Sequence, residues 1–312
     1  MPEYREGDEY VFTRIIGIGK NKRRYYMQIS TEIQSASAII GEERTIEYLA
    51  KAGFDAWDFS MFSMCKYDWG TGTLLDNSHP LAGNEYLRFC RNLKRIGLDN
   101  GIICNQSHAP FPSSCKEICS YYKRAIECTA EAGGEICVIH PNNDKSPEEN
   151  AELYFGLLPF AKEYKVKIAT ENMWNWDNKK NESCFAACAT PDDFCEHIDV
   201  VGSEWLVACL DIGHAEMRGN NTSAVEMIKA LGTRLQALHF HDNDRWHDSH
   251  QIPFSMNIDF LPIVKALKEI RYQGYFTLEA DQYLRAYTRD NIFDGIKELA
   301  DSARKLVKMF EE

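Results

Sequence analysis

Short apolar segments alternate with longer amphipathic segments through most of this chain, and this alternation limits the folds that it can adopt. Each apolar segment is six or seven residues long, which suits a strand of a parallel sheet that is buried on both faces. We predict eight strands, namely YYMQIS (25–30), FDAWDFS (54–60), GIICNQS (101–107), EICVIH (135–140), VKIATE (166–171), LVACLD (206–211), LQALHFH (235–241) and GYFTLEA (274–280).

Helical patterns occupy the segments between these strands. The clearest start combines Ser146 as an N-cap, Pro147 at the first helical position and Glu149 as the glutamate of a capping box. The helices are predicted at 42–52, 85–97, 115–132, 147–164, 191–199, 223–233, 259–271 and 289–310.

Eight strand–helix units predict a closed (β/α)₈ TIM barrel, an α/β fold in a single domain, because parallel strands with right-handed crossovers close into this shape. The chain has 312 residues, somewhat more than the about 250 of a typical barrel. We assign residues 25–312 to the barrel and residues 1–24 to an N-terminal extension. A doubly wound open sheet is the alternative fold.

Composition and charge limit the cellular location and the binding partners that we expect for this protein. The chain has no apolar run of about 18 residues, so no transmembrane helix is expected, and its charged start lacks the apolar centre of a signal peptide. The 11 cysteines are odd in number and scattered, which predicts free thiols and a cytoplasmic protein. A net charge of −12 opposes a broad phosphate-binding surface, so neither nucleic acid nor a membrane is an expected partner.

Polar residues close six successive predicted strands, from the third to the eighth. In a barrel the carboxyl ends of all strands open on one face, and binding sites form there. The residues in question are His108, His140, Glu171, Asp211 with His214 beyond it, His239 with His241, and Glu279. We therefore expect these side chains to meet at the mouth of the barrel.

Alternation along the strands sharpens this expectation, since side chains two residues apart in a strand share a face. His239 and His241 therefore point the same way, and Thr277 shares its face with Glu279. Carboxylates gathered in one place repel one another unless a positive charge lies between them. A divalent cation held by oxygen and imidazole ligands meets that need.

Each of these residues alone has a plainer explanation. A single glutamate or histidine at a strand end is usually a cap, an ion-pair partner or a hydrogen-bonded structural residue. Six successive strands with such an ending favour a shared metal site instead. Trp174 and Trp176 follow Glu171 closely and are expected to wall a pocket, with core packing as the alternative.

Six segments in order make this chain resemble the xylose-isomerase-like TIM-barrel superfamily: SHAPF, VIHPN, ATENMW, LDIGHA, LHFHDND with DSH, and TLEAD. The resemblance spans roughly residues 25–300. It covers two branches of different chemistry. One contains sugar and sugar phosphate isomerases and epimerases, and the other contains the apurinic-site nucleases of the endonuclease IV group, also called AP endonuclease family 2.

The two branches imply different metal contents. The epimerase branch implies one divalent cation (Mn²⁺, Co²⁺, Mg²⁺ or Zn²⁺) held by Glu171, Asp211, His239 and Glu279, with His241 open as an alternative to His239. The nuclease branch implies up to three Zn²⁺ ions. The candidates for a second or third metal, or for substrate binding, are His108, His140, His214, His241, Asp248 and His250.

By this resemblance the protein is a metal-dependent sugar isomerase or epimerase of cytoplasmic carbohydrate metabolism. Glu171 and Glu279 would be the catalytic residues, transferring a proton through a metal-stabilised enediolate. Three carboxylates against a doubly charged cation leave a net negative site, which favours a free sugar or inosose over a sugar phosphate. The expected substrate-binding residues are Arg245, Trp174, Trp176, Phe59 and Phe111.

Two other functions stay open: an endonuclease IV-like zinc phosphodiesterase acting on abasic-site DNA, and a non-catalytic sugar- or metal-binding barrel. The identity and phosphorylation of the sugar, isomerisation against epimerisation, and assembly into a homo-oligomer are also left open. The segment FSMNID (254–259) departs from the family pattern, because Phe254 and Met256 stand where glycines are common. We expect a bulkier loop there.

Overall fold

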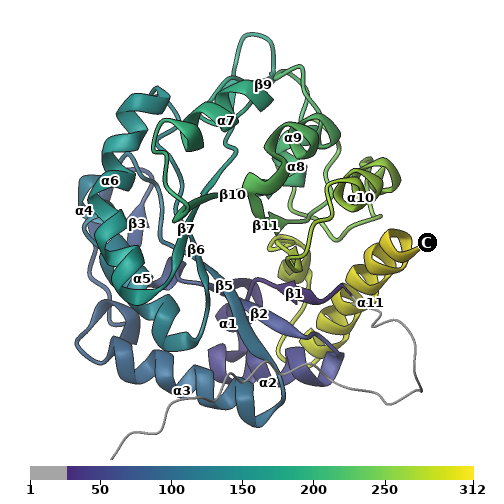
Figure 1. The fold of residues 1–312 in the computed structure, drawn as a ribbon. Helices are drawn as coiled ribbons and strands as arrows, with labels where there is room; N and C mark the ends of the chain where they lie inside the picture. The colour runs from purple at the N-terminus through teal and green to yellow at the C-terminus, as the bar shows by residue number, and fades with distance from the viewer. Residues whose placement is uncertain (1–26) are drawn as a thin grey trace, which may run out of the picture.

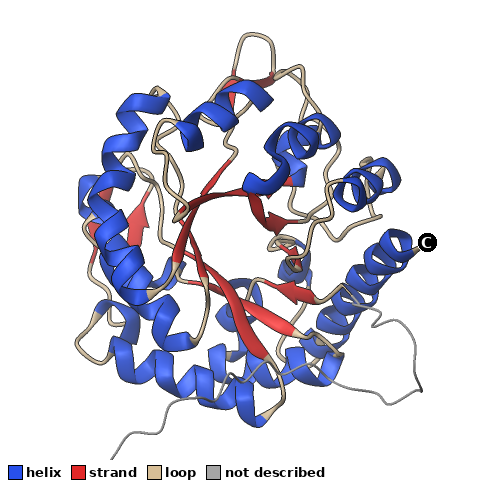
Figure 2. Ribbon diagram, in the orientation of Figure 1, coloured by secondary structure: helices blue, strands red, loops and turns tan. Residues whose placement is uncertain are grey.

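A ring of parallel strands enclosed by helices forms the structure (Figure 1), a computed structural model that describes residues 27–312. The N-terminal extension assigned to residues 1–24 lies outside the described residues, as does the start of the first predicted strand. Figure 2 shows the strands at the centre and the helices around them. The barrel strands are β1 (Ile29–Thr31), β2 (Ala56–Ser60), β5 (Ile103–His108), β6 (Ile136–Val138), β7 (Lys167–Glu171), β10 (Leu206–Asp211), β11 (Leu235–His239) and β12 (Phe276–Leu278).

These strands close into a ring. Six of them form one parallel sheet in the order β11-β10-β7-β6-β5-β2, and β1 pairs in parallel with β12. Single bridges join the two sheets, one between Glu32 and Asp58 and one between Phe240 and Leu278. The closure confirms the predicted TIM barrel and excludes the open doubly wound sheet.

Helices follow the strands on the outside of the ring. The described residues contain α1 (Gln34–Ile40), α2 (Glu42–Ala52), α3 (Tyr86–Asp99), α4 (Lys116–Cys119), α5 (Tyr122–Ala132), α6 (Pro147–Tyr164), α7 (Pro191–Asp199), α8 (Ile212–Glu216), α9 (Ala224–Leu231), α10 (Phe260–Glu269) and α11 (Ile292–Glu311). The bounds of α2, α6 and α7 coincide with the predicted ones. At α6 the capping box forms as expected, since Ser146 Oγ accepts from the Glu149 N–H and the Glu149 carboxylate accepts from the Ser146 N–H.

One predicted helix is wrong as a single element. The segment 115–132 breaks into α4 and α5, because Ser120 Oγ donates to the carbonyl of Glu117 at 2.6 Å and competes with the helical hydrogen bonds there. Two hairpins were not predicted, β3 (Lys66–Asp68) with β4 (Thr73–Leu75) and β8 (Asn175–Asp177) with β9 (Glu182–Cys184). Short 3-10 helices lie at η1 (Phe62–Met64), η2 (Pro80–Ala82), η3 (Gly232–Arg234) and η4 (Tyr283–Ala286).

Large apolar side chains fill the layer between the strands and the helices. Phe240 packs against Phe260 of α10 and Phe276 of β12, with ring centroids 6.2 and 5.0 Å apart. Trp57 and Phe59 of β2 pack edge to face, and the indole of Trp57 lies so close to α3 that a Cβ at Gly97 would come within 3.1 Å of its nitrogen. The outward-facing half of each strand therefore anchors the helices.

Small side chains fill the inside of the barrel below its mouth. Ala169, Val207, Cys209 and Ala237 form a buried cluster with Val138. Because side chains two residues apart share a face, Ala169 lies below Glu171, Cys209 below Asp211 and Ala237 below His239. The inner face of the barrel is therefore apolar at this level. The next inward-facing residue of each strand, toward its carboxyl end, is one of the polar residues of the mouth.

Neither a disulfide nor a membrane-spanning element is part of this architecture. All 11 cysteines lie within residues 27–312 and are free. Over the same residues, every helix is too short or too polar to cross a bilayer.

Phe276→Ala tests the importance of the layer between strands and helices. The ring of Phe276 is fully buried against Phe240 and Phe310, so its removal should lower the free energy of unfolding by about 3–5 kcal/mol. Urea denaturation followed by circular dichroism measures the change. Phe155→Ala on α6 is the control, because Phe155 is 51% exposed and its loss should cost less than about 0.5 kcal/mol. Equal losses in the two variants would contradict this account of the core.

Candidate metal centre

Four polar side chains from four strands meet at the carboxyl end of the barrel. Glu171 closes β7, Asp211 closes β10, His239 closes β11, and Glu279 directly follows β12. All four are buried, and one ligand atom from each lies within 4.8 Å of the others. We call this set the first site. It is the set that the resemblance implied.

His239 is oriented by groups on both of its ring nitrogens. Nδ1 lies 2.9 Å from Glu171 Oε1 and 3.1 Å from Glu279 Oε2, so this nitrogen faces the carboxylates. On the other side, Nε2 lies 3.4 Å from Asp58 Oδ2, and Gln106 Nε2 donates to that same oxygen at 2.9 Å. Because a metal-ligating histidine usually donates its other N–H to a carboxylate, Asp58 fits the role of an orienting partner.

Asp58 and Gln106 were missed in the sequence. Both are buried in barrel strands, Asp58 in β2 and Gln106 in β5. The signal was available for Asp58, since it is a carboxylate between two aromatic residues in a strand predicted to be buried, and a buried carboxylate needs a partner.

The charges of the first site are poised to hold a cation. Burial alone would raise the pKa of Glu171, but His239, His108 and His140 hold that pKa well below its usual range. Burial acts in the same direction on Glu279, and His239 outweighs it and lowers the pKa of Glu279 to about 2. Both carboxyl groups are therefore ionised at neutral pH.

Asp211 supplies the observation that decides whether a metal fits. It is fully buried, and its Oδ2 has no hydrogen-bond partner in the described part of the protein. A buried carboxylate oxygen without a partner is costly, and a cation removes that cost. With three carboxylates and one imidazole, the residues of the first site fit a divalent cation of the Mg²⁺, Mn²⁺, Co²⁺ or Zn²⁺ kind.

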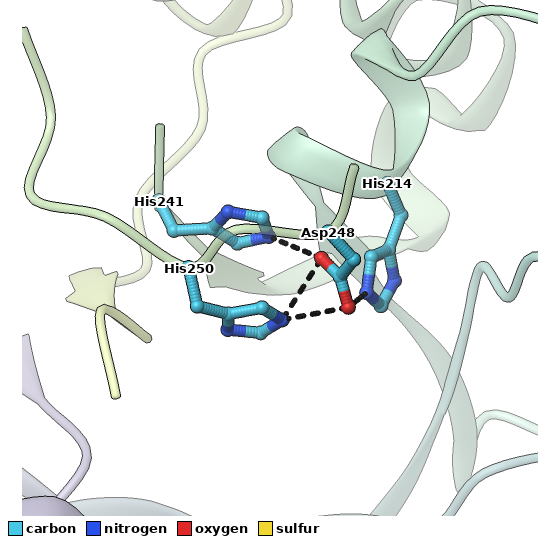
Figure 3. Close-up of side chains that lie close together, drawn as sticks. All are labelled: His214, His241, Asp248 and His250. Carbon is cyan, nitrogen blue, oxygen red and sulfur yellow. Dashed lines mark hydrogen bonds and ion pairs between the residues drawn. The ribbon is translucent and has the colours of Figure 1, made fainter. Parts of the chain in front are cut away.

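His241 belongs to a different group from His239. Figure 3 shows His241 with His214, Asp248 and His250, and one ligand atom from each of these four lies within 4.8 Å of the others. We call this set the second site. Both histidines point inward, as predicted, and each lies in its own cluster, so His239 is the histidine that meets the three carboxylates of the first site.

His108 and His140 form a third group with Glu171. His140 Nε2 lies 3.0 Å and His108 Nε2 lies 3.4 Å from Glu171 Oε2. His108 Nδ1 donates to the carbonyl of Ala109 at 2.9 Å, which turns Nε2 toward the glutamate. All the residues predicted as candidate metal ligands therefore gather at one mouth.

A cavity of about 530 Å³ opens above the first site. Glu171 and Glu279 line it, and Phe111 and Trp174 line it as predicted. Phe62 and Trp69 complete the wall formed by Phe111, with ring centroids 4.8 and 6.3 Å from that of Phe111. Trp69 follows β3 in the unpredicted hairpin and is 68% exposed. Among the described residues, none that lines the cavity is a lysine or an arginine.

Three of the predicted substrate-binding residues do not reach this cavity. Phe59 is wrong, because Asp58 points into the barrel and the next side chain must point toward the helices. Arg245 is also misplaced, since its guanidinium pairs with Glu216 at 3.2 Å and lines a separate cavity of about 420 Å³. Trp176 stacks on His247 behind Trp174 rather than on the cavity.

The family model described as xylose isomerase-like TIM barrel matches residues 46–309. This chain belongs to the xylose isomerase-like TIM-barrel family. An uncharacterized protein of Methanocaldococcus jannaschii is 27% identical over 81% of this chain and 80% of its own length.

Solved structures of other barrels are similar to this xylose isomerase-like protein at low sequence identity. A D-tagatose 3-epimerase-like protein has a TM-score of 0.66 and 22% identity, covering 90% of this chain and 98% of that one. An L-ribulose 3-epimerase has a TM-score of 0.64 and 17% identity, covering 91% and 95%. A D-psicose 3-epimerase, solved in the presence of D-fructose, has a TM-score of 0.62 and 13% identity, covering 90% and 99%. At these identities the comparison shows a shared fold.

Glu32, directly after β1, is a further buried carboxyl group near the mouth. Its side chain accepts hydrogen bonds from the N–H and the hydroxyl of Ser35. Burial raises the pKa of Glu32 to about 7 in spite of those hydrogen bonds, and the charge of Asp281 adds to the rise. Below about pH 7 the folded protein therefore holds Glu32 mainly in its neutral form.

Glu32→Gln tests this assignment through the pH dependence of stability. Because the folded protein holds the proton of Glu32 more tightly than the unfolded chain, the wild type should lose about 2–3 kcal/mol of stability from this group as pH rises from 5 to 8. The variant lacks that loss. We expect its stability, measured by urea denaturation across this range, to gain on the wild type steadily above pH 5. Parallel curves for the two proteins would contradict the raised pKa.

Proposed function

We propose that this protein is a divalent-metal-dependent isomerase or epimerase of an unphosphorylated sugar, in which Glu171 and Glu279 transfer the proton. The observation that carries the proposal is the meeting of two ionised glutamates and a fitting metal site at one cavity, which both glutamates line. The names of structurally similar proteins, which are epimerases of tagatose, ribulose and psicose, support a sugar as the substrate class.

A divalent cation held by the first site would polarise the carbonyl oxygen and the neighbouring hydroxyl of a bound sugar. Glu171 and Glu279 reach the cavity from different strands, β7 and the end of β12. An ionised carboxylate can accept a proton from carbon, and the carboxyl group so formed can return one. Removal on one face and return on the other inverts a carbon centre, whereas transfer between neighbouring carbons interconverts an aldose and a ketose.

The lining of the cavity favours an uncharged substrate. Because none of the described lining residues is a lysine or an arginine, a phosphate group would find no cationic partner. Trp174 stands on one side, held by a hydrogen bond from its Nε1 to Asp248 Oδ2 at 3.3 Å. Phe111 and Trp69 stand in the wall formed with Phe62. Aromatic faces of this kind pack well against the C–H faces of a sugar ring.

We propose a cytoplasmic location for the protein. The eleven free cysteines, several of them buried, support it, because free thiols suit a reducing compartment.

One observation favours the zinc phosphodiesterase as a second candidate, namely the three groups of ligands at one mouth. The absence of cationic residues from the described cavity lining speaks against a DNA backbone as substrate. Three zinc equivalents in the purified protein together with cleavage of abasic-site DNA would favour the nuclease over the isomerase.

The decisive experiment is a screen of free ketoses, aldoses and inososes in D₂O after removal of metal and reloading with Mn²⁺, Co²⁺ or Mg²⁺. We expect turnover only in the reloaded protein, with deuterium entering the product at one carbon, as read by NMR. Turnover without deuterium would exclude proton exchange through the glutamates. Binding of a sugar without any turnover would favour the non-catalytic barrel.

Glu171→Gln and Glu279→Gln should each lower kcat by a factor of about 10²–10⁴, because each removes one of the two proton-transfer groups. Metal content is measured alongside, so that a loss of proton transfer is separated from a loss of metal. The matched control is Glu269→Gln on α10, where the glutamate pairs with Lys229 at the surface. Normal turnover by both site variants would refute the assignment.

A further inference from the structure

The cavity that Glu171 and Glu279 line has a second part that the proposed proton transfer does not use. Glu171 is fully buried, whereas Trp69, which lines the same cavity, is 68% exposed. Two rings connect them: His140 Nε2 lies 3.0 Å from Glu171 Oε2, and the ring of Phe111 stacks on that of His140 with centroids 5.4 Å apart. The indole of Trp69 lies next to Phe111, with centroids 6.3 Å apart. The lining of the cavity therefore passes from buried charge to exposed aromatic surface.

The hairpin of β3 and β4 holds Trp69 at this exposed part of the cavity. Asp68 fixes the turn that carries Trp69, because its carboxylate accepts from the N–H of Gly70 at 2.8 Å. The ring of Tyr67 meets the indole edge to face, with centroids 5.0 Å apart and planes at 88°. The turn and the rings of Tyr67 and Phe111 thus position the indole, while most of its surface stays open to a ligand.

Polar side chains line the cavity beside these rings. Ser114 closely follows Phe111 in the chain, and both residues line the cavity. The hydroxyl of Ser113 donates to the carbonyl of Pro141 at 2.6 Å, which holds this loop against the one that carries Asn142. Ser114 and Asn142 offer a hydroxyl and an amide to a ligand that lies on the aromatic rings. Such a combination of apolar faces and a few polar groups suits a ligand rich in hydroxyl groups.

The cavity is larger than one sugar ring requires. Its volume is about 530 Å³. A hexose has about 12 non-hydrogen atoms, which would fill roughly 360 Å³ even if each took the about 30 Å³ that a molecule occupies in liquid water. Close packing against the protein would reduce that volume further. The cavity therefore has room for a second group beyond the ring that reacts.

A lone exposed aromatic residue is common on protein surfaces and does not by itself indicate a ligand. Trp69 differs in two respects. It lines the same cavity as the two glutamates, and it continues a wall that Phe62 and Phe111 begin. Because none of the described lining residues is a lysine or an arginine, the group that lies on this wall carries no negative charge.

We propose that Trp69 and Phe111 form an outer subsite for an uncharged second ring, so that the preferred substrate is a disaccharide rather than a monosaccharide. The ring with the reacting carbonyl lies toward Glu171 and Glu279, and the ring linked to it packs a C–H face on the indole of Trp69. This inference rests on the sugar chemistry proposed for the first site and adds the size of the substrate to it. Trp69 determines specificity in this scheme and takes no part in proton transfer.

The test compares fructose with isomaltulose, a fructose that carries a glucose ring on O6, as ligands of the full-length, metal-loaded protein. Isothermal titration calorimetry measures both affinities, and we expect isomaltulose to bind about tenfold more tightly. Trp69→Ala should weaken the binding of isomaltulose about tenfold, because it removes the aromatic face under the second ring, and should change the binding of fructose less than about twofold. Trp69→Phe should restore most of the affinity for isomaltulose.

Leu75→Ala is the matched control, because Leu75 lies in the same hairpin, is 45% exposed and is not one of the residues that line the cavity. It should leave both affinities unchanged. Equal affinity of the wild type for the two sugars, no binding of isomaltulose, or an equal loss of both affinities in Trp69→Ala would each overturn the outer subsite.

Turnover of both sugars is followed on the same samples, so that failure of the isomerase proposal and failure of the outer subsite give different results. Selective binding of isomaltulose that depends on Trp69, without turnover of either sugar, would support the outer subsite and refute the isomerase. Turnover of fructose that Trp69→Ala leaves unchanged, together with rejection of isomaltulose, would refute the outer subsite alone.

Discussion

The mutual repulsion of buried carboxylates at the barrel mouth is the constraint on which the rest of this structure depends. Glu171, Asp211 and Glu279 are buried close together, and one oxygen of Asp211 has no partner among the described residues. The closed ring of strands makes this possible, because the helices grip its outer face through large side chains while small ones such as Ala169 and Ala237 fill its inner face. The packing on the outer face of the ring stabilises the fold enough to tolerate a cluster of like charges at the barrel mouth. A bound cation would reduce the repulsion within that cluster.

Much of the fold could be predicted because its signals are local. Buried parallel strands are short and apolar, so all eight were found, and the helices with clear caps, such as α6, were placed to the residue. The hairpins β3–β4 and β8–β9 were missed because their strands are three residues long and mostly exposed or half-buried, so that no buried face imposes a pattern. The break within residues 115–132 was also not predicted, because a single side-chain hydrogen bond from Ser120 interrupts an otherwise helical pattern.

Strand geometry allowed prediction of those site residues that lie at strand ends. Residues at strand ends, such as Glu171 and His239, were found because closure of the ring brings those ends together. Phe59 was misjudged although alternation beside Asp58 would have turned it outward. Arg245 could not be placed at all, because it sits in a loop where the side chain of Asn243 accepts its N–H and turns the chain. The separation of His239 from His241 also needs the loop 240–259, which brings Asp248 and His250 to the latter.

Asp211 stands between the two clusters: it is part of the first site, and its Oδ1 lies 3.1 Å from His241 Nε2. Because Asp211 contacts both clusters, a charge bound at one of them would affect the other. An ion that draws on the charge of Asp211 leaves less of it for the neighbouring imidazole, and linkage requires that the effect be the same in both directions. The carboxylate of Asp211 therefore joins the two clusters, so that a cation at the first site and a charge on His241 would each change the affinity of the barrel mouth for the other.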